Sequence, residues 1–243
     1  MHAKLFKKKF CYNILVQITI LLASWFSLWL SVWGVFIFLL KRGVNYIQTF
    51  RLVVGYFLCF SFLAAYIYKP FLFPFFAHLP LKILPFSLLL LFYLLAFIIY
   101  AVGKKVFDKE ILEENKNRMM FFATFDNRFL LSKSFDILFQ QILLLSLVLF
   151  LQNFIQSNLL IILITGIIFG SMHLPMLKTK HNRIAPYFIF FSFLAGVFFS
   201  FLILFLPYGF LYSYITHWLF YIFAGIIITR RSSRKRKQML SFS

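Results

Sequence analysis

The chain has 243 residues, of which 63% are hydrophobic, 22% are aromatic and only 6 are acidic. Soluble globular domains carry about 25% charged residues, so a charged fraction of 13% and a mean hydropathy of +0.91 exclude a water-soluble globule. The formal net charge of +19 raises the question of nucleic acid. The basic residues, however, lie between apolar segments rather than beside stacking aromatics on a polar face, so no nucleic-acid partner is expected.

Seven apolar segments approach or exceed the roughly 20 residues that a helix needs to cross a bilayer. In chain order they are 11–40, 52–68, 82–102, 135–153, 158–176, 187–206 and 210–229. The stretch 69–81 is apolar, but prolines break it and it is too short to span, so we expect an interfacial or re-entrant loop there. The sequence thus predicts an all-α, polytopic transmembrane bundle with about seven spans, with eight as the alternative count.

Lysine and arginine gather in the segments that would share one side of such a bundle, namely 41–51, 103–134, 177–186 and the tail 230–243. Positive charge marks cytoplasmic loops, so the C-terminal tail is predicted to be cytoplasmic. Membrane lipid is the first partner expected, because a basic tail both anchors topology and contacts anionic head groups. The basic residues at 4–9 conflict with an odd span count, which places them on the opposite side.

Polar residues at four-residue spacing interrupt three of the predicted spans: Asp136 and Gln140, Phe169 and His173, and Ser213, His217 and Tyr221. Helical positions four apart share a face, and a histidine inside a membrane span marks a functional site by default. At about 1.5 Å per residue, His173 lies roughly 7 Å from Lys178 and Gln140 roughly 10 Å from Lys133. We therefore expect the polar stripes of the three spans to converge on one water-filled cavity.

The segment Phe169-Gly-Ser-Met-His173 and its neighbours resemble the CPBP family, the membrane proteins that include CAAX proteases and bacteriocin-processing enzymes, also called Abi. That family carries Glu-Glu-x-x-x-Arg on one span, Phe-x-x-x-His on the next and His-x-x-x-Asn on a later one. Phe169 and His173 match the second motif in full. His217 matches the third, although Tyr221 occupies its asparagine position.

In the frame of the first motif, Gln140 and Gln141 replace the two glutamates and Leu145 replaces the arginine. The resemblance covers about 130–230. It divides the chain into N-terminal transmembrane helices with basic loops (1–129), a CPBP-like helical core (130–230) and a basic cytoplasmic tail (231–243). It implies an intramembrane endopeptidase of prenylated or peptide substrates, with Gln141, Phe169, Ser213 and Tyr221 in substrate-binding or supporting positions.

Gln140 bears on activity because cleavage of a peptide bond by water requires a group that takes up a proton. Glutamine has no titratable proton and cannot act as that base. His173 and His217 alone fall short of the three protein ligands usual for catalytic zinc, so no cofactor is expected, with zinc left open. The sequence therefore favours a weakened or inactive member that keeps a substrate-binding cavity. An active endopeptidase and a non-catalytic scaffold or bacteriocin-immunity protein are the alternatives.

Two other places offer carboxylates. Glu113 and Glu114, followed by Arg118, fit Glu-Glu-x-x-x-Arg to the letter, but their flanks are hydrophilic and a whole span separates them from the place where the motif belongs. We expect them to be a decoy outside the helical core. Asp136 lies one turn before Gln140, and we expect a solvated helix start there.

Two further patterns concern packing. Trp25, Trp29 and Trp33 recur every four residues and predict a packing or interfacial stripe. Small residues recur at the same spacing in 166–170 and 196–200, which predicts close backbone approach between the two spans that carry them.

Overall fold

The computed structural model describes residues 2–44, 46–79, 83–106, 126–178 and 185–240. These residues form helices and connecting turns, with no strand among them. The α-helices are α1 (His2–Arg42), α2 (Phe50–Ile67), α3 (Lys69–Ala77), α4 (Ile83–Val106), α6 (Asn127–Gln152), α7 (Asn158–Ser171), α8 (Ala185–Phe205) and α9 (Gly209–Leu240). A short 3₁₀ helix, η1 (Leu174–Lys178), follows α7.

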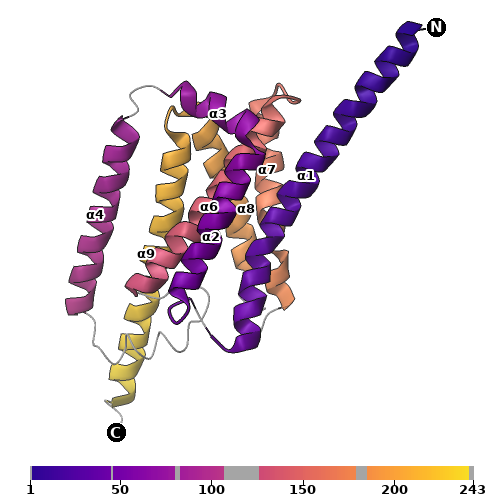
Figure 1. Ribbon diagram of the computed structural model, residues 1–243. Coiled ribbons are helices and arrows are strands. Elements are labelled where there is room, and N and C mark those ends of the chain that lie inside the picture. The colour runs from indigo at the N-terminus through magenta and orange to yellow at the C-terminus, as the bar shows by residue number, and fades with distance from the viewer. Residues whose placement is uncertain (1, 45, 80–82, 107–125, 179–184, 241–243) are drawn as a thin grey trace.

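Five of these helices are long and apolar enough to cross a membrane: Val16–Leu39 of α1, Phe50–Ile67, Asn127–Gln152, Pro186–Phe205 of α8 and Gly209–Ile227 of α9. Two shorter apolar helices, Ser87–Gly103 and Asn158–Ser171, run beside them (Figure 1). The chain is thus an all-helical bundle with the character of an integral membrane protein, as its composition predicts.

The helix α6 begins earlier than the sequence suggests. Residues 127–134 of the predicted loop 103–134 belong to α6, and the side chain of Asp126 caps this helix by accepting the backbone N–H groups of Arg128 and Phe129 at 2.8 and 3.3 Å. An aspartate at this position pairs two of the four N–H groups that a helix start leaves free. Because the helix starts at Asn127, Lys133 lies in its second turn and not in a loop.

The prediction of a loop at 69–81 is also wrong, since residues 69–77 form α3. Pro70 lies in its first turn, where the missing N–H of proline removes no helical hydrogen bond. The helix has 9 residues and is too short to span. It lies at the end of the bundle where the chain passes from α2 to α4 (Figure 1).

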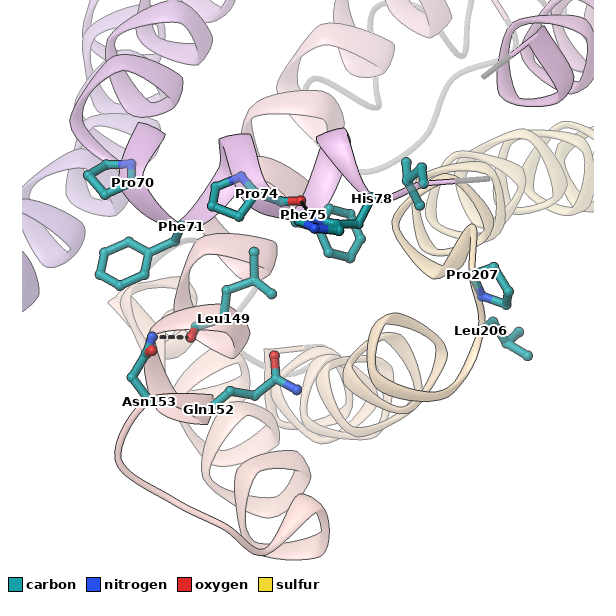
Figure 2. Close-up of a pocket in the computed structure, with 11 residues that line it drawn as sticks. Pro70, Phe71, Pro74, Phe75, His78, Leu149, Gln152, Asn153, Leu206 and Pro207 are labelled. Atoms are coloured by element: carbon teal, nitrogen blue, oxygen red, sulfur yellow. Dashed lines mark hydrogen bonds between the residues drawn. The ribbon is translucent and has the colours of Figure 1, made fainter. Parts of the chain in front are cut away.

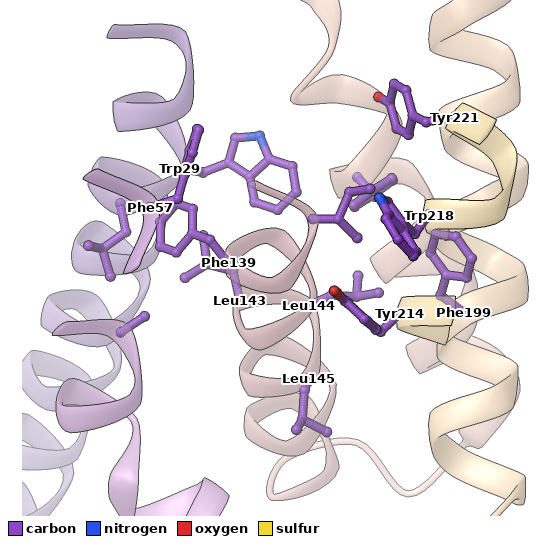
Figure 3. Packing of buried hydrophobic residues seen from close by; sticks show 14 of the residues in the cluster. Trp29, Phe57, Phe139, Leu143, Leu144, Leu145, Phe199, Tyr214, Trp218 and Tyr221 are labelled. Atoms are coloured by element: carbon purple, nitrogen blue, oxygen red, sulfur yellow. The ribbon is translucent and has the colours of Figure 1, made fainter. Parts of the chain in front are cut away.

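The centre of the bundle is α6, which contacts α1, α2, α3, α7, α8 and α9. It is apolar around most of its circumference, as a helix enclosed on all sides must be. Figure 3 shows Phe139 and Leu143 of α6 facing Trp29 and Phe57 on one side. All four of these side chains are at most 2% exposed. A polar residue on α6 therefore needs its partners inside the bundle.

Small residues bring α7 and α8 into close contact, as their spacing predicts. A Cβ atom added at Gly196 would lie 2.7 Å from the Cβ of Phe169 and 3.0 Å from the Cα of Gly166. At Gly166 the added atom would lie 2.5 Å from Val197. Glycine at these positions lets the two backbones approach and seats Phe169 against α8.

The tryptophan stripe of α1 packs against the bundle, which confirms the packing interpretation. Trp25 and Trp29 are each 2% exposed and stack with ring centroids 5.4 Å apart. Trp25 donates its indole N–H to the carbonyl of Leu143 at 2.8 Å, and Trp33 donates to the carbonyl of Met172 at 2.7 Å. Each hydrogen bond satisfies an indole N–H at the surface between α1 and its neighbours.

A cluster of three hydroxyl groups attaches α4 to the bundle. The hydroxyl of Tyr93 on α4 lies 2.6 Å from that of Ser134 on α6 and 2.6 Å from that of Tyr214 on α9. Ser134 and Tyr214 are themselves 2.8 Å apart. Because a hydroxyl both donates and accepts, the three groups can satisfy one another in a closed ring.

Candidate functional site

Four polar side chains of α6 are buried within two and a half turns of helix. Lys133, Asp136, Gln140 and Gln141 are 8%, 1%, 5% and 0% exposed. The expectation that Asp136 is a solvated helix start is therefore wrong. The helix begins nine residues earlier, so Asp136 lies in the enclosed part of α6. A buried carboxylate requires a partner.

That partner is Lys133. Its Nζ lies 2.5 Å from Oδ2 of Asp136, and the Nε2 of Gln140 donates to Oδ1 of the same carboxylate at 2.7 Å. The ammonium group also lies over two aromatic rings, 4.6 Å from the ring centroid of Tyr221 and 5.7 Å from that of Tyr46. Both carboxylate oxygens are thus occupied, and the cation is enclosed by aromatic faces that favour it.

Tyr46 lies in the turn between α1 and α2 and is 5% exposed. Its burial, reinforced by the negative charge of Asp136, raises the pKa of its phenol far above the ordinary value. Tyr46 therefore stays neutral at physiological pH and covers Lys133 as an uncharged ring.

Gln141 connects α6 to α9. Its Nε2 lies 3.1 Å from Nδ1 of His217, and its Oε1 accepts from the Oγ of Ser213 at 2.8 Å. The same hydroxyl lies 2.8 Å from the carbonyl of Phe210, so its single proton is shared between two acceptors. Because an amide nitrogen only donates, Nδ1 of His217 accepts, and the proton of this imidazole is on Nε2.

His173 does not lie on a helix, contrary to the prediction of a span over 158–176. The helix α7 ends at Ser171, and His173 occupies the turn between α7 and η1. Its Nδ1 donates to the carbonyl of Phe169 at 2.8 Å, which satisfies one of the last free carbonyls of α7. The Nε2 of His173 is consequently an acceptor, since a neutral imidazole carries one proton.

Phe169 lies between the two histidines. Its ring centroid is 5.3 Å from that of His173 and 6.2 Å from that of His217. The two imidazole centroids therefore lie at most about 11.5 Å apart. Aromatic rings surround both: Trp29 and Phe188 lie 6.4 and 5.8 Å from His173, and Phe199 and Tyr221 lie 5.2 and 5.8 Å from His217.

The structure thus separates the two glutamines. Gln141 contacts the histidine of α9, whereas Gln140, at the position of the predicted base, contacts Asp136. Successive helical residues are about 100° apart around the axis, so adjacent side chains reach different neighbours. Tyr221 connects the side chains around Asp136 with those around His217, because its ring faces both Lys133 and His217.

Glu113 and Glu114 lie outside the described residues. Within the described ranges, no three His, Cys, Asp or Glu side chains gather to hold a metal ion. The polar side chains described above form one cluster, made up of Tyr46, Lys133, Asp136, Gln140, Gln141, His173, Ser213, His217 and Tyr221. The sequence interpretation missed two of its members, Lys133 and Tyr46. For Lys133 a signal was present, because opposite charges three residues apart inside an apolar segment form a helical ion pair.

The cluster contains a neutral donor, Nε2–H of His217, and a neutral acceptor, Nε2 of His173, among aromatic rings. Its carboxylate is paired with a lysine and a glutamine amide. Such an arrangement can hydrogen-bond a polar backbone in an apolar setting. Comparison of the chain with protein-family models, with curated proteins and with solved structures found no match.

Proposed function

We propose that the protein is a CPBP-like intramembrane protein that has weakened or no peptidase activity and binds a peptide or prenylated-peptide segment within the membrane. The observation that carries the proposal is the contact between Gln141 and His217. An amide pairs with the imidazole at the place where a catalytic carboxylate would have to lie. Water activation therefore lacks its base at this histidine.

The other titratable groups of the cluster do not replace that base in the arrangement described above. Asp136 uses one oxygen for Lys133 and the other for Gln140. Each oxygen of this carboxylate therefore already accepts a hydrogen bond from a side chain of α6. His173 donates to a backbone carbonyl rather than to a carboxylate.

Binding is what the cluster supports. A peptide in a membrane must satisfy its N–H and C=O groups, because lipid offers no partner for them. His173 can accept an N–H and His217 can donate to a carbonyl, at centroids no more than about 11.5 Å apart. The aromatic rings around both histidines offer an apolar surface for a hydrophobic side chain or a prenyl group.

Two measurements test the proposal. Purified protein in nanodiscs should cleave farnesylated and unmodified peptides no faster than a His173→Ala variant. A fluorescent farnesyl-peptide should bind the wild type, and His217→Phe should weaken that binding about 10-fold, since a buried donor is lost. Thr216→Val is the matched control, because it removes an exposed hydroxyl from the neighbouring position of α9. Equal binding by both variants would refute the binding role.

An active endopeptidase is the second candidate, and the burial of Asp136 one turn from Gln140 favours it. In that case the wild type cleaves, and the double variant Lys133→Met/Asp136→Asn, which removes both charges together, does not. Cleavage abolished by Glu113→Gln would instead assign the base to the predicted decoy. Cleavage that survives both changes would exclude both carboxylates.

For the topology, we propose seven spans, formed by the five long helices and the two shorter apolar ones, with the tail in the cytoplasm. The alternation of the helices along the bundle and the charge of the tail support this (Figure 1). Green fluorescent protein fused after Ser243 should fluoresce, because it folds poorly outside the cytoplasm of bacteria. Activity of a periplasmic reporter at the same site would reverse the orientation.

A further inference from the structure

An open pocket of about 640 Å³ lies at the end of the bundle that carries α3, away from the histidine cluster. Three parts of the chain enclose it: α3 and the residue after its cap, the last turn of α6, and the turn between α8 and α9 (Figure 2). Gln152 in its wall is twelve residues, or about 18 Å of helix, from Gln140. The volume is in the range of small-molecule sites. The pocket is independent of the proposed peptide-binding function.

Three helix C-termini meet at this pocket. The helix α3 ends at Ala77, α6 ends at Gln152 and α8 ends at Phe205, and α9 begins at Gly209 in the turn that follows α8. The end of a helix carries free carbonyls and a partial negative charge. The start of α9 carries the opposite partial charge and offsets that of the end of α8, so the preference for groups that donate hydrogen bonds comes from the carbonyl ends of α3 and α6.

The capping side chains extend this preference. Asn153 donates its Nδ2 to the carbonyl of Leu149 at 2.9 Å, which leaves its Oδ1 as an acceptor. His78 donates Nδ1 to the carbonyl of Pro74 at 2.6 Å, which leaves Nε2 as an acceptor. Gln152 extends into the space between α3 and the α8–α9 turn (Figure 2). None of the described residues that line the pocket is Asp, Glu, Lys or Arg.

The remaining wall is apolar and is formed by Phe71, Phe75, Leu79, Leu149, Leu206 and three prolines. Exposed phenylalanines of α3, among them Phe73 at 76%, continue this surface outward. A ligand that fits both parts has a hydroxyl-bearing head and an apolar chain. A phosphate head group would lie beside the carbonyl ends of α3 and α6 with no lysine or arginine among the described lining residues.

We propose that this pocket binds a neutral lipid whose uncharged head group donates hydrogen bonds, of the diacylglycerol or glycosyl-diacylglycerol class. A hydroxyl of the head group donates to one of the acceptors on Gln152, Asn153 and His78, and the start of the acyl chain contacts Phe71 and Phe75. The helix α3 lies at the end of the bundle (Figure 1), where the head groups of a bilayer crossed by the long helices would lie. The ligand therefore enters from the membrane.

The test uses full-length protein in phosphatidylcholine nanodiscs that contain a diacylglycerol with a photoactivatable acyl chain. Mass spectrometry of the irradiated protein should find the label on peptides from α3, the end of α6 and the α8–α9 turn. Gln152→Leu should lower this labelling about threefold to tenfold, as the loss of one neutral hydrogen bond predicts. Leu149→Trp, which fills the pocket, should lower it further. Gln17→Leu changes an exposed glutamine of α1 and is the matched control.

Competition distinguishes the ligand classes. Unlabelled diacylglycerol should displace the probe, whereas phosphatidylglycerol and dissolved galactose at equal concentration should not. Displacement by phosphatidylglycerol would overturn the preference for a neutral head group, and displacement by galactose would assign the pocket to a soluble sugar. Labelling that is equal in the wild type, Gln152→Leu and Leu149→Trp would refute the site.

Discussion

Removal of the negative charge at position 136 should destabilise the protein strongly. Asp136→Asn keeps the size and one acceptor oxygen of the side chain, but it leaves the buried ammonium of Lys133 without its counter-charge. Both residues are enclosed, with relative exposures of 8% and 1%, so solvent cannot take over this role. The variant isolates the electrostatic part of the interaction.

The magnitude follows from the geometry. At an effective dielectric constant of about 20, opposite unit charges 2.5 Å apart attract by roughly 7 kcal/mol. Desolvation of the two ions offsets several kcal/mol of this, and loss of one partner of a buried pair typically costs about 3–5 kcal/mol. The rings of Tyr46 and Tyr221 continue to stabilise the cation. We therefore expect Asp136→Asn to lower the free energy of unfolding by about 3 kcal/mol, the lower end of this range.

Unfolding in mixed detergent micelles, followed by tryptophan fluorescence, measures this loss. The double variant Lys133→Met/Asp136→Asn should recover to within about 1–2 kcal/mol of the wild type, because an apolar replacement of a buried ion pair is often neutral. Lys69→Met, at an exposed lysine over Tyr66, should change stability by less than about 1 kcal/mol. If Asp136→Asn loses less than about 1 kcal/mol, or the double variant is no more stable than the single one, the buried ion pair is refuted.

Three further changes probe the packing and the hydrogen bonds. Gly196→Ala should lower the free energy of unfolding by about 1–3 kcal/mol in the same assay, because the added Cβ would lie 2.7 Å from the Cβ of Phe169 on α7. Gly34→Ala is the control and should be nearly neutral, because an added Cβ there would meet nothing within 4 Å. Equal effects would contradict the close approach of α7 and α8. Gln141→Leu should cost about 1–3 kcal/mol, because the buried Nδ1 of His217 loses its donor and the hydroxyl of Ser213 keeps only the carbonyl of Phe210; an unchanged unfolding midpoint would show that the bonds of Gln141 are absent. Tyr93→Phe should broaden the spin-label distance distribution between α4 and α9, since it removes the hydroxyl that bonds both neighbouring helices, while Tyr66→Phe, 70% exposed, should leave it narrow. Identical distributions would refute the role of the hydroxyl ring.

Composition and local spacing determined much of the fold. A membrane helix must satisfy its own backbone, so an apolar segment of sufficient length is a helix whatever surrounds it. For this reason the predicted spans overlap the observed helices, and apart from the unpredicted helix α3 the errors lie at their ends. The start of α6 depends on a cap at Asp126, and the end of α7 depends on the turn that holds His173. Both are single contacts that a hydropathy pattern does not reveal.

The candidate site was predictable only in part. The sequence by itself identified His173, His217 and the glutamine pair, because polar groups in apolar spans stand out. Only the tertiary structure decided that Gln141, and not Gln140, contacts His217, since helix rotation and neighbour positions select the partner of each side chain. It also decided that Lys133 and Asp136 are buried together. The depth at which a charge lies depends on which helices cover it, and that arrangement arises when α1, α2 and α9 pack around α6.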